Sequence, residues 1–463
     1  MLFNVYIYSI NLITMKTTPF LAVILLSIVT LSSCKKVSQT KEYTANKPVY
    51  MSYEDLRSSI KNDNNRSLVK PGKIFLYNQY ILINDFEEGI HVYNNSNPTS
   101  PEHIAFIEIP GNVDRAVMDD VLYADSYVDI VSIDFTDPRN VEVIDREENA
   151  LSYTIPSQMD FNYPVSNIDP SKGVVLGYEI GEVTEKCSDS ECGYQYYDHV
   201  MVHRGEWDGN MMSEEGTVVN FAGTNNNNVR SMSASNTQGA LAGSMARFIM
   251  VDDHLYVIAD GNNVKVFAAD RSGLSAVTSF QPWSDAGAWG TIETLFSFKE
   301  HLFIGSTTGM LAYDVSSPSS PSYLSMYTHM TACDPVVAND DYAFVTLRAG
   351  NECGMNQTDQ LDVLDISNIM NPFLIGEYQL TSPKGLALDS DNELLFVCDG
   401  ESGMVIYDIN NINSLDNLGR TSGDTYDVIA HNNIAHVIGN GGLVQYQYNA
   451  DGSLTQLSKI SLQ

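Results

Sequence analysis

Four of the six cysteines stand where they could form disulfide bonds. Cys187 and Cys192 lie close together in CSDSEC, a spacing that suits a clip across the tip of a loop. Cys333 and Cys353 flank a segment whose pattern predicts two strands folded back at 339–341, which would bring its ends together. We therefore predict the pairs Cys187–Cys192 and Cys333–Cys353, in a compartment where disulfides persist.

A fifth cysteine, Cys398, stands inside the apolar stretch LLFVC. No histidine stands near it in the sequence, and an apolar setting raises the pKa of a thiol. We expect a buried free thiol that packs like a small hydrophobic side chain, not a nucleophile.

Residue types that bind metals occur in two places. His199 and His203 in HVMVH would share one face of a strand. Two histidines do not complete a zinc shell, and no carboxylate or cysteine at a suitable spacing joins them, so a surface pair is expected. The acidic stretch 389–393 offers oxygen ligands but lacks the loop pattern of an EF-hand, so it predicts a plain turn. The sequence predicts no metal site.

Aspartates recur at one position of a repeated motif, as Asp134, Asp314, Asp365 and Asp408. They could form a ring of ligands, but an aspartate at a strand end more simply accepts N–H bonds from the following turn. No nucleophile elbow, phosphate loop, dinucleotide fingerprint or HExxH helix occurs. The sequence predicts no catalytic or cofactor-binding residue, although a carboxylate pair at hydrolytic spacing stays open.

The elements that would position these side chains come from a motif written seven times. Each copy has an apolar strand, a turn rich in Asp, Gly and Asn, and a second apolar strand. The second strands end at Asn94, Asp134, Ala269, Asp314, Asp365, Asp408 and Gln447. These ends are 40, 135, 45, 51, 43 and 39 residues apart, and all but one spacing suits a single four-stranded sheet. Such small sheets need neighbours to pack against, so the sequence predicts an all-β fold, a seven-bladed β-propeller.

The one long spacing has two interpretations. It either contains an insertion of about ninety residues, 147–245, or hides two degenerate blades. We favour the insertion, in which GVVLGYEIGEV and YQYYDHVMVH would pair as a hairpin and which would cap one face of the ring. The ring would begin with an inner strand near Lys73 and end with an outer strand near 454–462. Strand exchange between the ends is then not expected, unless residues 48–53 supply it.

The composition limits the class of partner. The 463 residues include 25 basic and 58 acidic side chains, which gives a formal net charge of −33. A chain so acidic repels nucleic-acid phosphates and anionic lipids, so no nucleic-acid partner is expected. With 43% hydrophobic residues, the chain is globular and can bury one large core or two ordinary ones.

The N-terminal segment from Met15, MKTTPFLAVILLSIVTLSSCKK, has the pattern of a secretory signal. One basic residue precedes an apolar run that is too short to stay in a bilayer as an anchor. The small residues before Cys34 resemble the lipobox of bacterial lipoproteins, which implies lipidation of Cys34 and removal of residues 1–33. The alternative is an ordinary cleaved signal with a chance cysteine. The resemblance implies a cell-envelope protein, at the outer membrane, that contacts the membrane only through its lipid.

The motifs IVSID, LDVLD and MVIYD resemble the LVIVD repeat family of bacterial and archaeal cell-surface proteins. The similarity runs from about Lys73 to the C-terminus and implies a β-propeller, but it says little about activity. Gln447 departs from the pattern, which puts the register of the last blade in doubt. The resulting organisation is a signal peptide at 1–33, a lipidated tether and short segment at 34–70, and a propeller at 71–463.

For function, we expect a non-catalytic binding or scaffolding module without a cofactor. Loops from all blades of a propeller form a broad surface that suits an envelope protein, peptide or glycan. Trp207, Trp283 and Trp289 could stack on a sugar or peptide, although packing in the core or rim is the default for each. The alternative is a glycan-directed hydrolase or lyase with its site in the propeller funnel. An enzyme would place two carboxylates, or a histidine and an acid, at reacting distance in a deep pocket.

Overall fold

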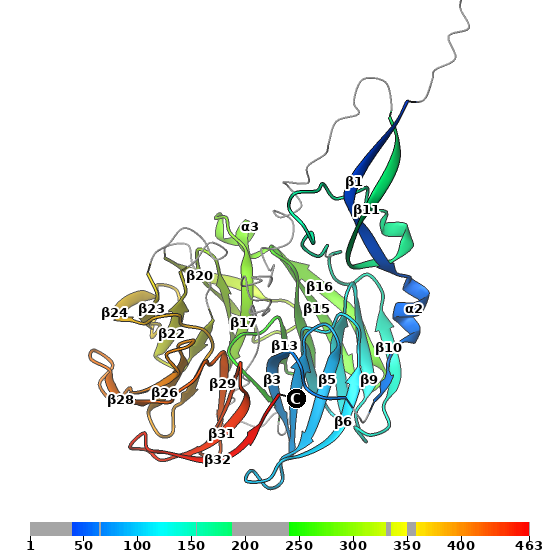
Figure 1. Cartoon of the computed structure of the whole chain (residues 1–463). Coiled ribbons are helices and arrows are strands. Elements are labelled where there is room, and N and C mark those ends of the chain that lie inside the picture. The colour runs from blue at the N-terminus through cyan, green and yellow to red at the C-terminus, as the bar shows by residue number, and fades with distance from the viewer. Residues whose placement is uncertain are drawn as a thin grey trace, which may run out of the picture.

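Seven small antiparallel sheets are arranged around a common axis in the computed structural model (Figure 1). The structure describes residues 39–63, 66–153, 155–187, 240–329, 335–349 and 358–462. Four consecutive strands form each sheet, and the four run in order from the axis to the rim. The predicted seven-bladed β-propeller is therefore confirmed.

The blades follow one another along the chain. Blades 1 to 4 consist of β3 (Pro71–Tyr77), β4 (Tyr80–Asp85), β5 (Gly89–Asn94) and β6 (Glu102–Glu108); β7 (Arg115–Met118), β8 (Val121–Ser126), β9 (Asp129–Asp134) and β10 (Glu142–Glu147); β13 (Phe248–Val251), β14 (His254–Asp260), β15 (Asn263–Asp270) and β16 (Gly273–Phe280); and β17 (Ile292–Phe298), β18 (His301–Ser306), β19 (Gly309–Asp314) and β20 (Ser322–Thr328). Blades 5 to 7 consist of β21 (Val336–Ala338), β22 (Tyr342–Leu347), β23 (Gln360–Asp365) and β24 (Phe373–Gln379); β25 (Leu386–Asp389), β26 (Leu394–Cys398), β27 (Met404–Asp408) and β28 (Asp416–Arg420); and β29 (Asp427–His431), β30 (Ile434–Gly439), β31 (Gly442–Tyr448) and β32 (Leu454–Ile460). The remaining elements are β1 (Gln39–Met51), α2 (Tyr53–Ser58), β2 (Lys61–Asn62), η1 (Pro170–Lys172), β11 (Val174–Cys187), β12 (Ala240–Ala242) and α3 (Pro282–Ala286).

Strand order gives the ring two different faces. Turns between the first and second strands, and connections between the third and fourth, lie on one face, which we call the turn face. Connections from one blade to the next lie on the opposite face, the connection face. The pairing of third and fourth strands is interrupted by a bulge in all seven blades. A bulge bends and twists a strand, which shapes the outer edge of each blade.

The core lies between the faces of neighbouring blades. Apolar clusters join blade 1 to blade 2, blade 2 to blade 3, blade 3 to blade 4, and blade 6 to blade 7, and one larger cluster joins blades 4, 5 and 6. Blades 2 and 3 pack directly against each other through residues such as Met118, Ile130, Phe248 and Leu255. The interpretation with two hidden blades is therefore wrong, and the long spacing is an insertion.

The ring is closed without exchange of strands between its two ends. Blade 7 packs against blade 1 through Ile74, Ile83, Ile429 and Ile438, all buried. The suggestion that residues 48–53 supply a shared strand is wrong, because β1 pairs with β11 and not with a blade. β2 adds a short outer strand to blade 1, and β12 adds an inner one.

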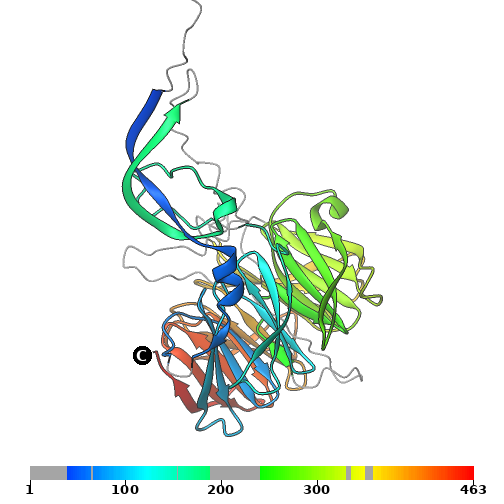
Figure 2. The same ribbon diagram turned by 90° about the vertical axis from the view of Figure 1, so that its right-hand side faces the viewer.

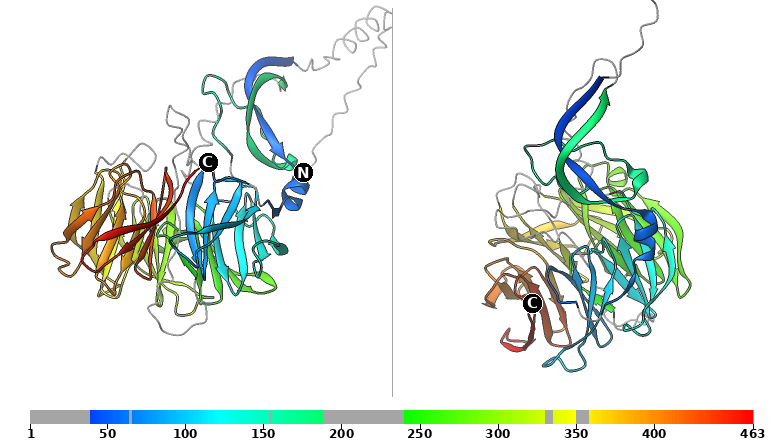
Figure 3. Two further views of the ribbon diagram at one scale, coloured as in Figure 1. Left: turned by 60° about the horizontal axis from the view of Figure 1, so that its bottom comes forward. Right: turned by 45° about the vertical axis from the view of Figure 1, so that its right-hand side comes forward.

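β1 and β11 form a separate two-stranded ribbon that stands away from the blades in every view (Figures 1, 2 and 3). Residues 39–51 pair with residues 174–187, so GVVLGYEIGEV pairs with the N-terminal segment. One edge of this strand pairs with β1, and the predicted partner YQYYDHVMVH, residues 194–203, lies outside the described part of the chain, so that hairpin stays a prediction. Sequence reasoning missed this pairing because no turn connects the two strands.

The base of the ribbon is joined firmly to blade 2 by a small core and an ion pair. Leu56 of α2, Val128 and Val174 are buried together, with Met51 and Tyr153 packed around them.

A buried carboxylate continues this joint. The Asp129 carboxylate accepts hydrogen bonds from Arg57 Nε at 3.0 Å and from Arg146 at 3.1 Å, and its side chain is fully buried. Hydrogen bonding to Asp129 raises the pKa of Arg57. Because one carboxylate ties α2 to β9 and β10, the ribbon leaves the ring at a fixed angle.

The strand pairing also tests the register of the repeat. In a blade, the first residue of the second strand pairs with the motif position near the end of the third strand. Tyr80 pairs with Asn94 in blade 1, and Leu394 pairs with Asp408 in blade 6. In blade 3 this partner is Ala268, so the assignment of Ala269 was off by one residue. Gln447 faces Ile434, so the last blade keeps the register of the others.

In the described ranges, no helix has both the length and the apolar character needed to cross a membrane.

The hairpin between β4 and β5 depends on one glycine. Gly89 has φ +146°, and a Cβ added there would overlap with the carbonyl oxygen of Ile107. Gly89→Ala should therefore lower the free energy of unfolding by about 2 kcal/mol, as expected for a side chain forced into a disfavoured conformation. Gly177→Ala in β11 is the control, because nothing lies within 4 Å of its added Cβ. Urea denaturation measures both, and equal midpoints for the two variants would contradict the assignment.

Candidate functional site

Most of the residues considered from the sequence for disulfide bonding, lipidation, metal binding or stacking fall outside the described part of the chain. These are Cys34, His199, His203, Cys192, Trp207, Cys333 and Cys353, together with the side chain of Cys187. Both disulfides and the lipidation site therefore stay predictions. Cys398 is described and is a free thiol with no exposed surface, and burial raises its pKa well above the usual value. The prediction of a buried free cysteine is confirmed.

The motif aspartates cap turns, as predicted. Each accepts the backbone N–H two residues ahead, with N···O distances of 2.9 Å for Asp134, 2.8 Å for Asp314, 3.0 Å for Asp365 and 2.8 Å for Asp408. Hydrogen bonds from Thr136 and Ser316 lower the pKa of Asp134 and Asp314. These carboxylates are at the rim of the turn face, so they do not form a ring of ligands at the axis.

A second set of aspartates, at the ends of second strands, was missed by sequence reasoning. Asp85, Asp125 and Asp399 are buried, and each holds the segment that enters its own blade by accepting two successive backbone N–H groups. The donors are Val69 and Lys70 for Asp85, Val113 and Asp114 for Asp125, and Thr381 and Ser382 for Asp399. A sequence signal for these aspartates was present, because the strand patterns YILIND, VLYADS and LLFVCD each contain one aspartate at or near the end.

Other predicted positions are structural. Asp389 accepts N–H bonds from Asp391 and Asn392, so stretch 389–393 is a turn, as predicted. Trp283 of α3 is buried in the core, whereas Trp289 is exposed. In the ranges that the structure describes, no group of three His, Cys, Asp or Glu side chains is placed to hold a metal ion.

The connection-face end of the axis holds a buried charge network. Lys73 Nζ lies 2.9 Å from Asp114 Oδ2, and both side chains are almost fully buried. The same carboxylate oxygen accepts the backbone N–H of Arg247 at 2.8 Å. Arg115 donates to the carbonyl oxygens of Lys73 and Leu82. The network thus ties together the inner strands of blades 1, 2 and 3.

Burial shifts the protonation equilibria of this network. It lowers the pKa of Lys73 to about 8, with the Asp114 charge acting in the opposite direction. It raises the pKa of Asp125 to about 6, with the nearby Asp114 charge adding to the effect. The pKa of Asp427, which lies across the axis, is also raised well above its usual value by burial. Buried groups with shifted pKa values can mark reactive sites, but these groups contact one another and the backbone, which is also typical of structural networks.

The funnel is filled at this level by the chain itself. Ser244 and Ala246 have no exposed surface, and the backbone N–H of Leu386 donates to Ser244 Oγ at 2.7 Å. Carboxylates are therefore present at the axis, but they do not line an open pocket.

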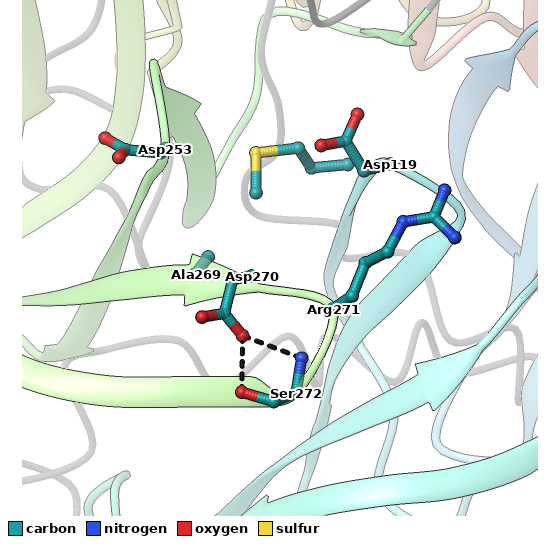
Figure 4. Close-up of a pocket in the computed structure, with 7 residues that line it drawn as sticks. Asp119, Asp253, Ala269, Asp270, Arg271 and Ser272 are labelled. Carbon is teal, nitrogen blue, oxygen red and sulfur yellow. Dashed lines mark hydrogen bonds between the residues drawn. The ribbon is translucent and has the colours of Figure 1, made fainter.

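An open hollow lies on the turn face, between blades 2 and 3 (Figure 4). Its volume is about 570 Å³, and its lining residues are Met118, Asp119, Asp253, Ala269, Asp270, Arg271 and Ser272. Met118 and Ala269 are buried and form the apolar part. Sequence reasoning missed this hollow because it combines turns of two blades that are separated by the insertion.

The polar groups of this hollow are held by local contacts. Asp270 accepts hydrogen bonds from the backbone N–H and the hydroxyl of Ser272, and the hydroxyl bond lowers its pKa. Arg271 lies 3.3 Å from Asp120. Three carboxylates and one guanidinium thus surround a small apolar surface.

Comparisons with known proteins find solved structures of low similarity and no family. No family model matches the chain, and no curated protein matches it. A putative 6-phosphogluconolactonase from Bacteroides fragilis is structurally similar, with 8% identity, coverage of 84% of this chain and 96% of that one, and a TM-score of 0.49. A periplasmic gluconolactonase from Pseudomonas aeruginosa has 11% identity, coverage of 84% and 96%, and a TM-score of 0.46. A protein from Lactobacillus plantarum has 11% identity, coverage of 84% and 97%, and a TM-score of 0.49.

At these identities and TM-scores the solved structures carry no argument about function. The class of the protein follows from its own sheet order: it is a seven-bladed β-propeller.

Asp125 should give the stability a measurable pH dependence. Its pKa is about 6 in the folded state and about 3.9 in the unfolded state, so the folded protein binds more protons between these values. Its contribution to stability is full below about pH 4 and is lost as the pH rises through 6. Asp125→Asn keeps an oxygen acceptor for the N–H donors. The free energy of unfolding of this variant, relative to that of the wild type, should increase by up to about 3 kcal/mol as the pH rises from 4 to 7.

Asp134→Asn is the matched control from the same hairpin. Its pKa is lowered in the folded state, so its contribution is present above the unfolded pKa and lost as the pH falls. This variant should lose stability against the wild type at pH 7, with a small effect because the carboxylate is exposed. Urea denaturation from pH 4 to 8 measures both, and a profile of Asp125→Asn parallel to the wild type would refute the shift.

Proposed function

We propose that this chain is a lipid-anchored, extracytoplasmic propeller that binds an envelope protein, peptide or glycan without covalent chemistry. The LVIVD-like repeats and the lipobox-like residues before Cys34 support this proposal. In it, Cys34 carries the lipid, residues 1–33 are removed, and the protein lies at the outer membrane.

The observation that carries the proposal is the position and rigidity of the ribbon. β1 begins at Gln39, only a few residues after Cys34. Its thirteen residues, at about 3.3 Å each, span about 40 Å. Because Leu56 and Arg57 fix its base on blade 2, a lipid at Cys34 would hold the ring at a set distance from the membrane. Such a spacer suits a protein that presents a surface to a partner.

Exposed apolar side chains support a binding surface on the same part of the molecule. Of the twelve large hydrophobic residues that are exposed in the described ranges, five belong to the ribbon and to the segment before η1. These are Val49, Met159, Phe161, Leu176 and Ile180. Asn46 holds that segment against β1 by donating to the carbonyl oxygens of Asp160 and Tyr163. In the register of the ribbon, Ile180 faces Asn46, which holds the segment with Met159 and Phe161, so these apolar residues can serve one interaction site.

The alternative, a glycan-directed hydrolase or lyase in the funnel, has less support. Such an enzyme needs carboxylates that its substrate can reach. Asp114 and Asp427 are buried beside residues 243–247, which occupy the axis.

Cys34→Ala tests the anchor. In the producing bacterium, the wild type should incorporate labelled palmitate and sediment with membranes, and the variant should do neither. The purified variant should unfold at the wild-type urea concentration, because Cys34 lies before the first strand. A wild-type chain without bound lipid would refute the anchor but not the binding role.

The double variant Phe161→Ser/Ile180→Ser tests the binding surface. Cross-linking in intact cells should recover at least tenfold less partner with this variant than with the wild type, since truncated central contacts typically cost more than about 1 kcal/mol each. Phe373→Ser is the control, because this exposed residue lies on the rim of blade 5. Equal recovery with both variants, or turnover of envelope glycans by the wild type, would contradict the proposal.

A further inference from the structure

Residues 240–247, at the C-terminal end of the insertion, run along the axis of the ring. β12 pairs antiparallel with β3, with Ala240 facing Tyr77 and Leu241 facing Leu76. Tyr77 is the turn-face end of β3, whereas Arg247 contacts Asp114 at the connection face. The segment therefore passes through the ring from one face to the other and does not cross over its surface.

On its way, the segment contacts the inner strands of blades 6 and 7. Ser244 Oγ accepts the backbone N–H of Leu386, the first residue of β25, at 2.7 Å. The backbone N–H of Ser244 hydrogen-bonds to the carboxylate of Asp427, the first residue of β29. Gly243 fits closely against Asp427, because a Cβ on this glycine would overlap with the carboxylate.

It then contacts blades 4 and 2 before it enters blade 3. The backbone N–H of Leu295 in β17 donates to the carbonyl oxygen of Ala246 at 2.5 Å. The backbone N–H of Arg247 donates to Asp114, just before β7, and Phe248 begins β13. Eight residues thus contact six of the seven blades.

We propose that residues 240–247 are an axial clasp that holds the ring closed. Every blade is built from four consecutive strands, so no shared strand joins the first blade to the last. The clasp supplies that joint at the axis: it is paired with β3 of blade 1 and hydrogen-bonded to Asp427 of blade 7. In the same way it joins blades 1 and 2, which precede the insertion, to blades 3 to 7, which follow it.

Variants at the axis test the clasp in the full-length protein. Gly243→Ala places a methyl group against Asp427, and Ser244→Ala removes the acceptor for Leu386. Both variants should lower the urea concentration at which blade 1 separates from blade 7. The separation is measured by fluorescence energy transfer between dyes attached to cysteines introduced at Ser96 in blade 1 and Ser453 in blade 7. Gly177→Ala in the ribbon is the control.

Cutting the chain gives a direct measurement. A specific protease site placed between residues 224 and 228, outside the described ranges, divides the protein into a piece with blades 1 and 2 and a piece with blades 3 to 7. The pieces should stay associated. Leu241→Ala should raise their dissociation constant about fivefold or more, because Leu241 belongs to the second piece and packs against blade 1 residues of the first. In the uncut protein, adding Asp427→Ala to Gly243→Ala should restore part of the lowered urea midpoint, because it removes the overlapping carboxylate.

The outcomes separate the clasp from a plain connector. A connector tolerates small substitutions, so wild-type urea midpoints for Gly243→Ala and Ser244→Ala, or a wild-type dissociation constant for Leu241→Ala, would overturn the proposal. An additive effect of Asp427→Ala would do the same, since it would mean that Gly243 and Asp427 do not act on each other.

Discussion

Apolar packing between neighbouring sheets is the interaction on which the rest of the structure depends. A four-stranded sheet of this size has two apolar faces and cannot be stable alone, so it must be covered on both sides. A ring covers every blade only if the first and last blades also meet, as Ile74 and Ile429 do. Closing such a ring leaves an axis surrounded by inner strands, and an empty axis would lose packing along its whole length. Filling the axis with Ser244, Ala246 and their neighbours solves both problems with one segment.

The charges at the axis follow from the same constraint. Inner strands converge there, and their backbone groups and entry segments must all find partners away from water. The Asp114 carboxylate accepts hydrogen bonds from two such groups, the side-chain ammonium of Lys73 and the backbone N–H of Arg247. Burying such charges is costly unless they are paired, so removing one partner costs more than the pair contributes. These groups are therefore better explained as the means by which blades 1, 2 and 3 are held in register than as catalytic residues.

Prediction from the sequence succeeded where the information is local and repeated. The strand and turn pattern predicted seven blades, because the pattern is complete within each copy, and four of the copies also carry the capping aspartate. It failed by one residue at Ala268, because blade 3 ends its third strand with a tight turn at Asp270 instead of the usual loop. The axial clasp and the charge network were not predictable in this way. Lys73 and Asp114 are 41 residues apart, Asp114 and Arg247 are 133 apart, and nothing in the local pattern of either partner indicates the other.

The ribbon shows how an insertion can change what a propeller presents. Its two strands come from the N-terminal segment and from the connection between blades 2 and 3, so both enter on the connection face. The hollow lined by Asp119 and Asp253 lies on the opposite, turn face. Groups bound at the ribbon and in the hollow would therefore approach from different sides of the ring. The ribbon cannot swing without breaking the ion pair between Arg57 of α2 and Asp129 of blade 2, so this joint holds the two directions apart.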